Sequence, residues 1–433
     1  MPPETRAPRF DGITRQGGAG IPDRYRVLAL LFFLVLIMFL DRLCIAVAGP
    51  RMQRELNISP AQWGWVIGVF TISYGLFEIP AGMLADRVGA KRVLLRIVLW
   101  WSAFTSLTGA VTGLNSLLAA RFLFGAGEAG CFPSCASVIS RWIPAVERAR
   151  ASSVIWVAVN LAAAIAPLTI VEIQKTLGWR AAFYIFGSLG VVWAVVWYRL
   201  FADTPGQARG ITAEERRVIG EPPVRSGSVP WRRLFREPNF LKLLLMYHSY
   251  CYGSYFFTTW FHTYLQVGRG LTEDEMKYAA SLPSWASMAG IVAGGYLSDR
   301  LARRYSLRVA RCSIGSFVLL LSGATLLAAT LTKGNWLAVA LITVSHGFMS
   351  AMLPVTWSLC VDLGGQYSGS VSASMNMAGQ AGAFVSGVGF GYLVESLGSY
   401  DLALRPLAAM LIVSGFVYAT IKPQPLSLPE REA

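Results

Sequence analysis

Five charged side chains interrupt long apolar stretches of the sequence: Asp41, Arg42, Glu78, Arg121 and Glu128. A charge at the centre of a bilayer costs about 2.5–3.5 kcal/mol on insertion scales, so such residues are functional candidates. A buried carboxyl group takes up a proton to avoid desolvation, and a neighbouring arginine favours its release. The planar guanidinium group of arginine suits bidentate binding of a carboxylate. These residue types therefore predict anion binding coupled to proton transfer.

Two of these charges share one face of a predicted helix. Arg121 and Glu128 are seven positions apart, or about 10 Å along a helix, which is too far for a direct ion pair and leaves room for an anion. We expect Arg42 and Arg121 to bind the substrate anion, and Glu128 and Asp41 to carry the coupled protons. An anion that takes over the arginine lets the carboxyl group accept a proton more readily. The alternative is a charge network that only orients helices, and Glu78 is open between a titrating site and a packing residue.

The composition is that of a membrane protein. Of 433 residues, 54% are hydrophobic and 14% charged, whereas soluble globular proteins carry roughly 25% charged residues. The apolar residues form uninterrupted blocks such as 27–40, and the charge clusters between the blocks despite a net charge of +14. This pattern excludes a soluble enzyme, a disordered protein and a nucleic-acid-binding domain. The six cysteines form no CxxC pair and the three histidines are scattered, so we expect no metal and no cofactor.

Twelve stretches reach the roughly 20 mainly apolar residues that a helix needs to cross a bilayer. Their apolar residues run continuously rather than alternating, which predicts an all-α membrane protein and not a barrel. The first stretch follows a long polar segment and is interrupted by a charged pair at 41–42, so we interpret it as a retained helix and not a signal peptide. The predicted spans are 26–48, 63–84, 93–113, 117–139, 152–173, 179–200, 239–264, 276–297, 309–331, 336–358, 369–394 and 402–421.

The basic residues predict the orientation of these spans. The connections on the side of the N-terminus hold 26 lysines and arginines, and those on the other side hold 7. Because cytoplasmic loops are enriched in basic residues, both termini are predicted to be cytoplasmic, in a multi-pass protein of the inner membrane. A polar, proline-containing connection splits the spans into two groups of six. The predicted domains are a tail (1–25), a first half (26–200), a linker (201–238), a second half (239–421) and a tail (422–433).

A short motif occurs once in each half, after its second span. The residues at 82–92 read Gly-Met-Leu-Ala-Asp-Arg-Val-Gly-Ala-Lys-Arg, and those at 295–300 read Gly-Tyr-Leu-Ser-Asp-Arg. Six-helix repeats are typical of alternating-access transporters, with the substrate site between the halves near the midplane. We expect these loops to act in gating, through ion pairs between helices that break on switching; the alternative is a role in topology alone. The predicted gating residues are Gly82, Asp86, Arg87, Asp299 and Arg300.

With these motifs the chain resembles the major facilitator superfamily. The loop at 82–92 matches its best-known motif, and Arg-Phe-Leu-Phe-Gly at 121–125 resembles a second. Through segments at 40–42, 121–133, 259–265 and 374–379, the chain is similar to the anion:cation symporter group. That resemblance implies the twelve-helix fold of the superfamily and proton-coupled carriage of sugar acids or related organic anions. It also points to the charged residues identified above.

Two residues depart from the pattern of that group. Glu78 stands where glutamine is expected, and His262 stands where proline is usual. The first departure adds a carboxyl group to the predicted span, and the second suggests a different bend at the end of its helix.

Further polar side chains in the spans are candidates for contacts with substrate hydroxyl groups. They are Tyr74, Tyr252, Tyr255, Asn376 and Gln380. We therefore expect a secondary transporter that works as a monomer in the lipid bilayer and imports a small organic anion, a sugar acid such as a hexonate, hexuronate or aldarate, with protons. The alternatives are a carrier of aromatic or small dicarboxylic acids, a proton-driven exporter of the same fold, and a membrane sensor or enzyme without transport activity.

Overall fold

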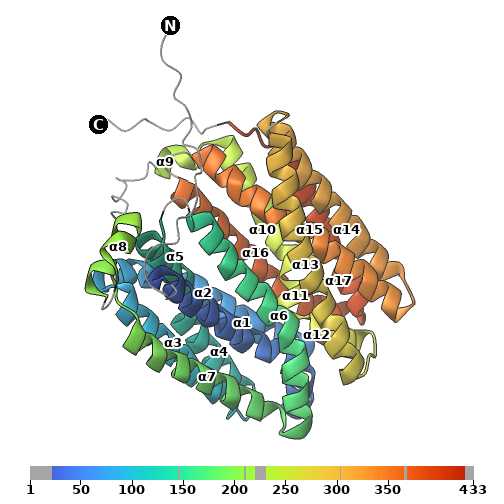
Figure 1. Cartoon of the computed structure of the whole chain (residues 1–433). Helices are drawn as coiled ribbons and strands as arrows, with labels where there is room; N and C mark the ends of the chain where they lie inside the picture. Colours follow the sequence, from blue (N-terminus) through green and yellow to red (C-terminus); the bar gives the residue numbers. More distant parts are fainter. Residues whose placement is uncertain are drawn as a thin grey trace.

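The computed structural model describes residues 22–144, 147–208, 211–219, 231–302, 304–364 and 368–424. Within these ranges the regular elements are helices that pack into one bundle (Figure 1). This agrees with the all-α architecture expected from the unbroken apolar runs. The predicted tails and the predicted linker lie partly outside the described residues.

One group of helices precedes the central connection. It consists of α1 (Asp23–Glu55), α2 (Pro60–Val88), α3 (Ala90–Thr108), α4 (Leu114–Glu128), α5 (Cys131–Trp142), α6 (Arg148–Thr176) and α7 (Trp179–Leu200). The described part of the connection contains the short helices η2 (Pro205–Gln207), α8 (Ala213–Ile219) and α9 (Trp231–Leu234).

The second group follows the connection. It consists of α10 (Pro238–Ser254), α11 (Phe256–Thr259), α12 (Phe261–Thr263), the π-helical η3 (Tyr264–Gly268), α13 (Glu273–Ala302), the π-helical η4 (Arg308–Ser313), α14 (Ile314–Leu331), α15 (Asn335–Gly364), α16 (Ser368–Leu397) and α17 (Tyr400–Ala419).

Eight of the described helical stretches are long and apolar enough to cross a membrane. They are Asp23–Glu55, Leu114–Trp142, Ser153–Thr176, Trp179–Leu200, Arg308–Leu331, Asn335–Gly364, Ser370–Leu397 and Tyr400–Ala419. The four other predicted spans also coincide with helices, in α2, α3, α10 to α12 and α13.

The helix that contains the first predicted span extends about two turns beyond the predicted end of that span. The prediction stopped at residue 48, whereas α1 continues through Pro50 to Glu55. Polar residues after Pro50 resemble a connection in the sequence. A helix nevertheless continues beyond its apolar stretch, because its backbone hydrogen bonds do not depend on the polarity of its side chains. The longer α1 places Asp41 and Arg42 close to its middle.

The fourth predicted span is interrupted directly after Glu128. Gly130 has a φ of +86°, a left-handed conformation that glycine adopts at little cost. A Cβ atom at this position would lie 2.4 Å from the Cβ atom of Ala81 on α2. Both the turn and the close packing of α2 therefore require glycine, and the helix axis breaks beside a buried carboxylate.

We name the two ends of the bundle by the helix ends found there. The linker face is the end where α7 ends and α10 begins, and the opposite face is the end where α1 ends and α13 begins (Figure 1). The two groups of helices contact each other mainly through α2 against α16 and α6 against α13. Glycine permits the first contact, since a Cβ atom at Gly68 would lie 2.4 Å from the Val388 side chain.

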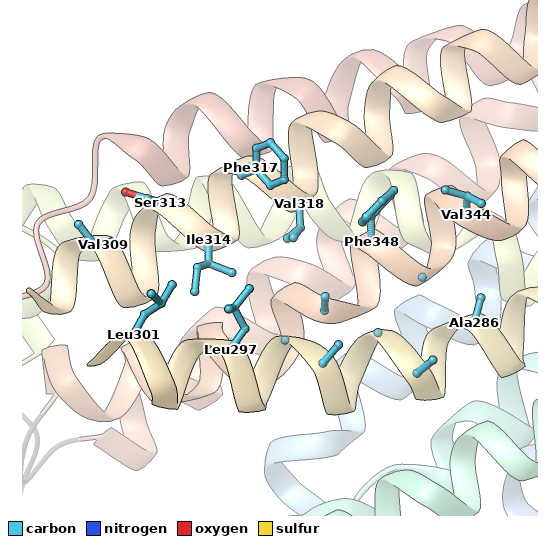
Figure 2. A pocket seen from close by; sticks show the side chains of 16 residues that line it. Ala286, Leu297, Leu301, Val309, Ser313, Ile314, Phe317, Val318, Val344 and Phe348 are labelled. Atoms are coloured by element: carbon cyan, nitrogen blue, oxygen red, sulfur yellow. The ribbon is translucent and has the colours of Figure 1, made fainter. Parts of the chain in front are cut away.

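Small residues also bring α13 close to α15. A Cβ atom at Gly290 would lie 2.1 Å from the carbonyl oxygen of Gly347, and one at Gly294 would lie 2.1 Å from that of Ala351. Such contacts are typical of helices that pack in membranes. The same small residues leave a groove between α13 and α14, with α15 as its floor (Figure 2).

Candidate functional site

A small cavity between the two groups of helices brings together several of the predicted substrate residues. Arg42 reaches it from α1, Arg121 from α4 and Tyr255 from the junction of α10 and α11. Its volume is about 20 Å³, room for about one water molecule. The cavity is lined by Arg42, Ile45, Ala46, Trp63, Ile67, Phe70, Arg121, Tyr255, Thr258 and Thr259.

An ion pair joins α1 to α4 beside this cavity. Nη2 of Arg42 lies 3.0 Å from Oε1 of Glu128, and the two side chains are 15% and 0% exposed. Arg121 and Glu128 both lie on α4, and their spacing predicted a distance too long for an ion pair. The sequence therefore did not identify the partner of the Glu128 carboxylate. The tertiary structure supplies the partner, Arg42, from α1. Breaking such a buried pair from one side leaves an uncompensated charge, which is strongly unfavourable.

Arg121 is the second cation at the cavity and is almost wholly buried, with 4% exposure. Its guanidinium carbon lies 4.7 Å from the ring centroid of Phe70 and 4.8 Å from that of Phe124. Nε of Arg121 has no hydrogen-bond partner within the described residues. A buried guanidinium group with donors to spare is suited to bind an anion.

Phe70 is a site residue that the sequence reasoning missed. Its ring lies 4.9 Å from the guanidinium carbon of Arg42 as well as 4.7 Å from that of Arg121. Cation–π contacts of desolvated arginines contribute about 2 kcal/mol, so one ring holds both cations at the cavity. The spacing of Phe70 and Tyr74, four apart on one face of α2, was the signal that could have found it.

Asp41 occupies a different environment from its neighbour Arg42. It is 1% exposed, and neither carboxyl oxygen has a hydrogen-bond partner within the described residues. The Glu128 carboxyl group is close enough to interact with it electrostatically. A buried carboxyl group with no cation beside it is expensive in its charged form.

Neither of the two remaining tyrosines, Tyr74 and Tyr252, is among the residues that line the cavity. Tyr74 is buried, and its ring centroid lies 5.1 Å from the guanidinium carbon of Arg42. Tyr252 does not line the cavity; its hydroxyl group faces Gly389 on α16. Asn376 and Gln380 are half-buried on α16 and do not line the cavity either.

The predicted gating loops are described only in part. The side chains of Gly82, Asp86, Arg87 and Asp299 lie outside the described part of the chain. Arg300 is exposed, and its Nη1 donates a hydrogen bond to the hydroxyl group of Tyr296 at 3.1 Å.

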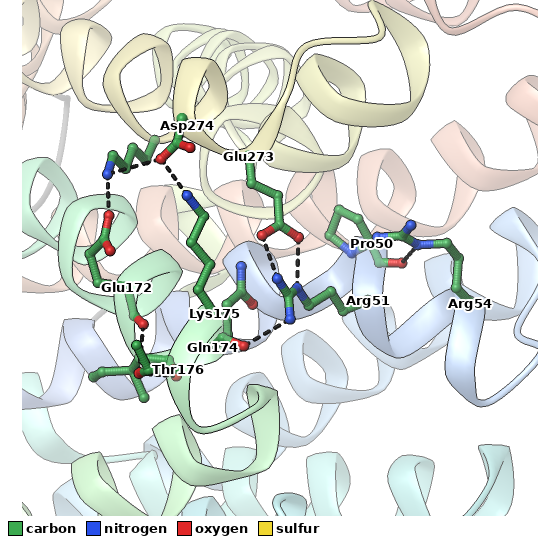
Figure 3. A network of polar contacts seen from close by, with 11 residues as sticks. Pro50, Arg51, Arg54, Glu172, Gln174, Lys175, Thr176, Glu273 and Asp274 are labelled. Atoms are coloured by element: carbon green, nitrogen blue, oxygen red, sulfur yellow. Dashed lines mark hydrogen bonds and ion pairs between the residues drawn. The ribbon is translucent and has the colours of Figure 1, made fainter.

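An ionic network that the sequence reasoning missed ties the two groups of helices together at the opposite face (Figure 3). Arg51 on α1 forms a two-pronged contact with Glu273 on α13, with Nε donating at 2.6 Å, and it also donates to the Gln174 carbonyl at 2.8 Å. Lys175 on α6 pairs with Asp274 on α13. The network joins α1 and α6 of the first group to α13 of the second group at this end of the bundle.

A further pair strengthens the contact between α6 and α13. Lys277 on α13 pairs with Glu172 on α6, and it lies 3.1 Å from Asp274. The signal for this network was present in the sequence as charges at the ends of three predicted spans. Nothing in their spacing showed that these ends would meet.

Comparison with solved structures supports the fold. The chain is similar to the crystal structure of a bacterial homologue of the human lysosomal transporter Spinster, in an inward-facing and unoccupied conformation. The TM-score is 0.75 at 20% identity, over 93% of this chain and 97% of that chain. At this identity the likeness concerns the fold alone.

The most informative sequence relatives are carriers of organic anions. A probable sulfoacetate transporter, SauU, of Cupriavidus necator is 33% identical over 93% of this chain and 95% of its own. A D-galactonate transporter of Escherichia coli O6:H1 is 29% identical, covering 91% and 94%. A hexuronate transporter of Bacillus subtilis is 28% identical, covering 92% and 93%.

These relatives confirm the resemblance to the anion symporter group that the motifs indicated. The family profile of the Major Facilitator Superfamily matches residues 31–387, most of the chain. Together with the all-helical fold, this match shows that the chain belongs to the Major Facilitator Superfamily, a family of membrane transporters and not of enzymes.

Proposed function

We propose that this protein imports an organic anion together with one or more protons by alternating access. The observation that carries the proposal is the pairing of Arg42 with Glu128 beside a second buried arginine, Arg121, at a cavity between the two halves. Two guanidinium groups and a single paired carboxylate give the cavity an excess of positive charge. An anion is therefore the ligand that its electrostatics favour.

Proton coupling follows from competition for Arg42. A substrate carboxylate or sulfonate that reaches Arg42 replaces Glu128 as its partner. The displaced Glu128 carboxylate is then buried without a cation, and it avoids that cost by taking up a proton. Asp41, which already lacks a cation within the described residues, is the second proton carrier. One proton taken up for each negative charge of the substrate leaves the net charge of the site unchanged, so loading adds no charge that must cross the bilayer interior.

Sugar acids are the substrate class first expected, and two relatives carry names of that class, D-galactonate and hexuronate. A small dianion is the second candidate. It is supported by the two arginines at the cavity, Arg42 and Arg121, whose polar neighbours in the lining are mainly the hydroxyl groups of Tyr255, Thr258 and Thr259. The sulfoacetate named for the relative from Cupriavidus necator is a molecule of that kind.

The membrane arrangement belongs to the same proposal. All twelve predicted spans cross the bilayer, the two six-helix halves rock against each other, and the linker face lies in the cytoplasm of an inner-membrane protein. The basic residues between the predicted spans support this orientation. The ionic network around Glu273 then closes the site on the outer side. The transporter functions as a monomer, since one chain contains both halves of the site.

A ligand screen followed by uptake tests the proposal. Purified protein is heated with hexonates, hexuronates, aldarates, sulfoacetate, small dicarboxylates, aromatic acids and neutral sugars. A ligand at 100 times its dissociation constant adds about 2.7 kcal/mol of stability, and the shift in melting temperature should vanish in Arg42→Ala.

Uptake into proteoliposomes with an imposed pH gradient then separates coupling from binding. Wild-type protein should concentrate the ligand, whereas Glu128→Gln should bind it without concentrating it. A Glu128→Gln protein that still concentrates substrate would refute proton coupling through this residue. A stability shift confined to the neutral sugars would refute anion transport.

A further inference from the structure

A long apolar groove runs between α13 and α14 on the outside of the second half (Figure 2). Its volume is about 570 Å³, and the hydroxyl group of Ser313 is the one polar side-chain group among its lining residues. Such a lining offers no donors for an organic anion. The groove is therefore distinct from the charged cavity between the halves.

The groove is open toward the surroundings of the bundle. Ala289, Ala293 and Leu297 on α13 are exposed, and so are Phe317 on α14 and Val344 on α15. In a member of a membrane transporter family, an exposed apolar surface along crossing helices faces lipid. Its natural occupant is an acyl chain.

The length of the groove fits one leaflet of a bilayer. Its lining residues extend along α13 from Ala286 to Leu301, which is about 22 Å of helix. Half of the hydrocarbon core of a bilayer is about 15 Å thick. The groove is thus long enough for an acyl chain that begins at the linker face and reaches the midplane.

Three arginines lie in the chain near lining residues at the linker-face end of the groove, which we call its mouth. The amide of Arg304 donates to the carbonyl oxygen of Leu301, a lining residue, at 3.1 Å. Arg308 directly precedes the lining residue Val309. Arg300, Arg304 and Arg308 are exposed, and no ion pair is formed by them within the described residues.

The acidic and aromatic residues near this mouth also favour an anionic headgroup. Asp362 is already held by Arg311, whose Nε lies 3.2 Å from Oδ2. Tyr296 and Tyr305 are exposed at the same end, where amphipathic rings suit the headgroup region. The cations at the mouth therefore have no described carboxylate to neutralise them, and they attract an anionic headgroup.

We propose that this groove is a binding site for one anionic phospholipid. An acyl chain lies between α13 and α14, and the headgroup phosphate is bound by Arg304 and Arg308. Apolar burial holds the chain, and charge complementarity selects an anionic over a zwitterionic headgroup. The site does not depend on which substrate the transporter carries.

Native mass spectrometry of the full-length protein in detergent tests the site, with phosphatidylglycerol and phosphatidylcholine of the same acyl chains as probes. The wild type should bind one phosphatidylglycerol in preference to phosphatidylcholine. The double variant Arg304→Gln/Arg308→Gln should weaken phosphatidylglycerol binding by about 30-fold and phosphatidylcholine binding by much less, because the choline cation offsets the charge of its phosphate. Its matched control, Arg216→Gln/Arg217→Gln in α8, removes two exposed arginines away from the groove and should behave like the wild type.

A second variant tests the acyl-chain part of the site. Ala293→Phe places a ring in the groove from an exposed position, and it should abolish retention of both lipids at this site. Ala409→Phe on α17 makes the same change at an exposed position away from the groove and should have no effect. Equal binding of the two lipids by the wild type, or wild-type binding by Ala293→Phe, would overturn the proposal. Size-exclusion profiles establish that each variant is folded.

Discussion

Replacement of Glu273 by glutamine should loosen the opposite face of the bundle. Glu273 receives two hydrogen bonds from Arg51, and the two side chains are 17% and 29% exposed. The pair connects α13 of the second half to α1 of the first half, so any motion that opens this face must break it. The glutamine side chain keeps the size of the glutamate but removes its charge.

The magnitude follows from the geometry of the pair. Hydrogen bonds to charged groups contribute about 1.5–3 kcal/mol to stability, and the lower end applies because both side chains keep some exposure to solvent. The population in which this face is open should therefore rise by roughly 10- to 30-fold. The pairs of Lys175 and Lys277 remain intact, so the face should loosen without staying open.

Hydrogen–deuterium exchange measures this change in the purified protein. Where opening is fast and reversible, amide exchange follows the population of the open form. Peptides from the end of α1 and the start of α13 should exchange faster in Glu273→Gln, whereas peptides from the linker face should be unaffected.

The matched control is Glu275→Gln. Glu275 lies in the same first turn of α13, but its carboxylate accepts hydrogen bonds from the amide and hydroxyl groups of Thr272 and does not contact the other half. Its replacement removes the same charge and should leave exchange at the end of α1 unchanged. Equal exchange in wild type and Glu273→Gln, or equal acceleration in both variants, would refute the role of the Arg51 pair as a latch.

Three further outcomes are expected. The Arg51 guanidinium group lowers the pKa of Glu273 below its usual value of 4.5, so the pair stabilises the closed face above that pH and is lost as the pH falls through the lowered pKa. The difference in amide exchange between wild type and Glu273→Gln should therefore disappear in acid. A difference that grows in acid would contradict this expectation. Arg121→Lys should weaken substrate binding by roughly 10- to 100-fold in titrations, yet retain pH-driven uptake at saturating substrate. An unaltered affinity would show that Arg121 does not bind the substrate. Gly130→Ala should lower the melting temperature more than Gly178→Ala, because both glycines have positive φ angles but only the first has a close neighbour within 4 Å; equal losses would mean that strain alone matters.

The sequence alone determined the class of the protein and its family. Long unbroken apolar runs leave a polytopic helical membrane protein as the stable form, because a backbone in lipid must satisfy its own hydrogen bonds. The repeated Asp-Arg loops and the motif that begins at Arg121 identified the superfamily. The cost of burying charge also identified the residues of interest, since Arg42, Arg121 and Glu128 stood out against apolar surroundings before any contact was known.

The tertiary structure decided which of these residues act on one another. Arg42 and Glu128 are 86 positions apart in the sequence and meet at 3.0 Å, and Phe70 on a third helix holds both arginines. Arg51 and Glu273 meet across the two halves, although each reads as an ordinary charge at a helix end. Spacing along one helix fixes only which residues share a face, whereas pairing between helices depends on how their axes pack. For this reason the charged residues were visible in the sequence, while their partners and the closed opposite face emerged only from the fold.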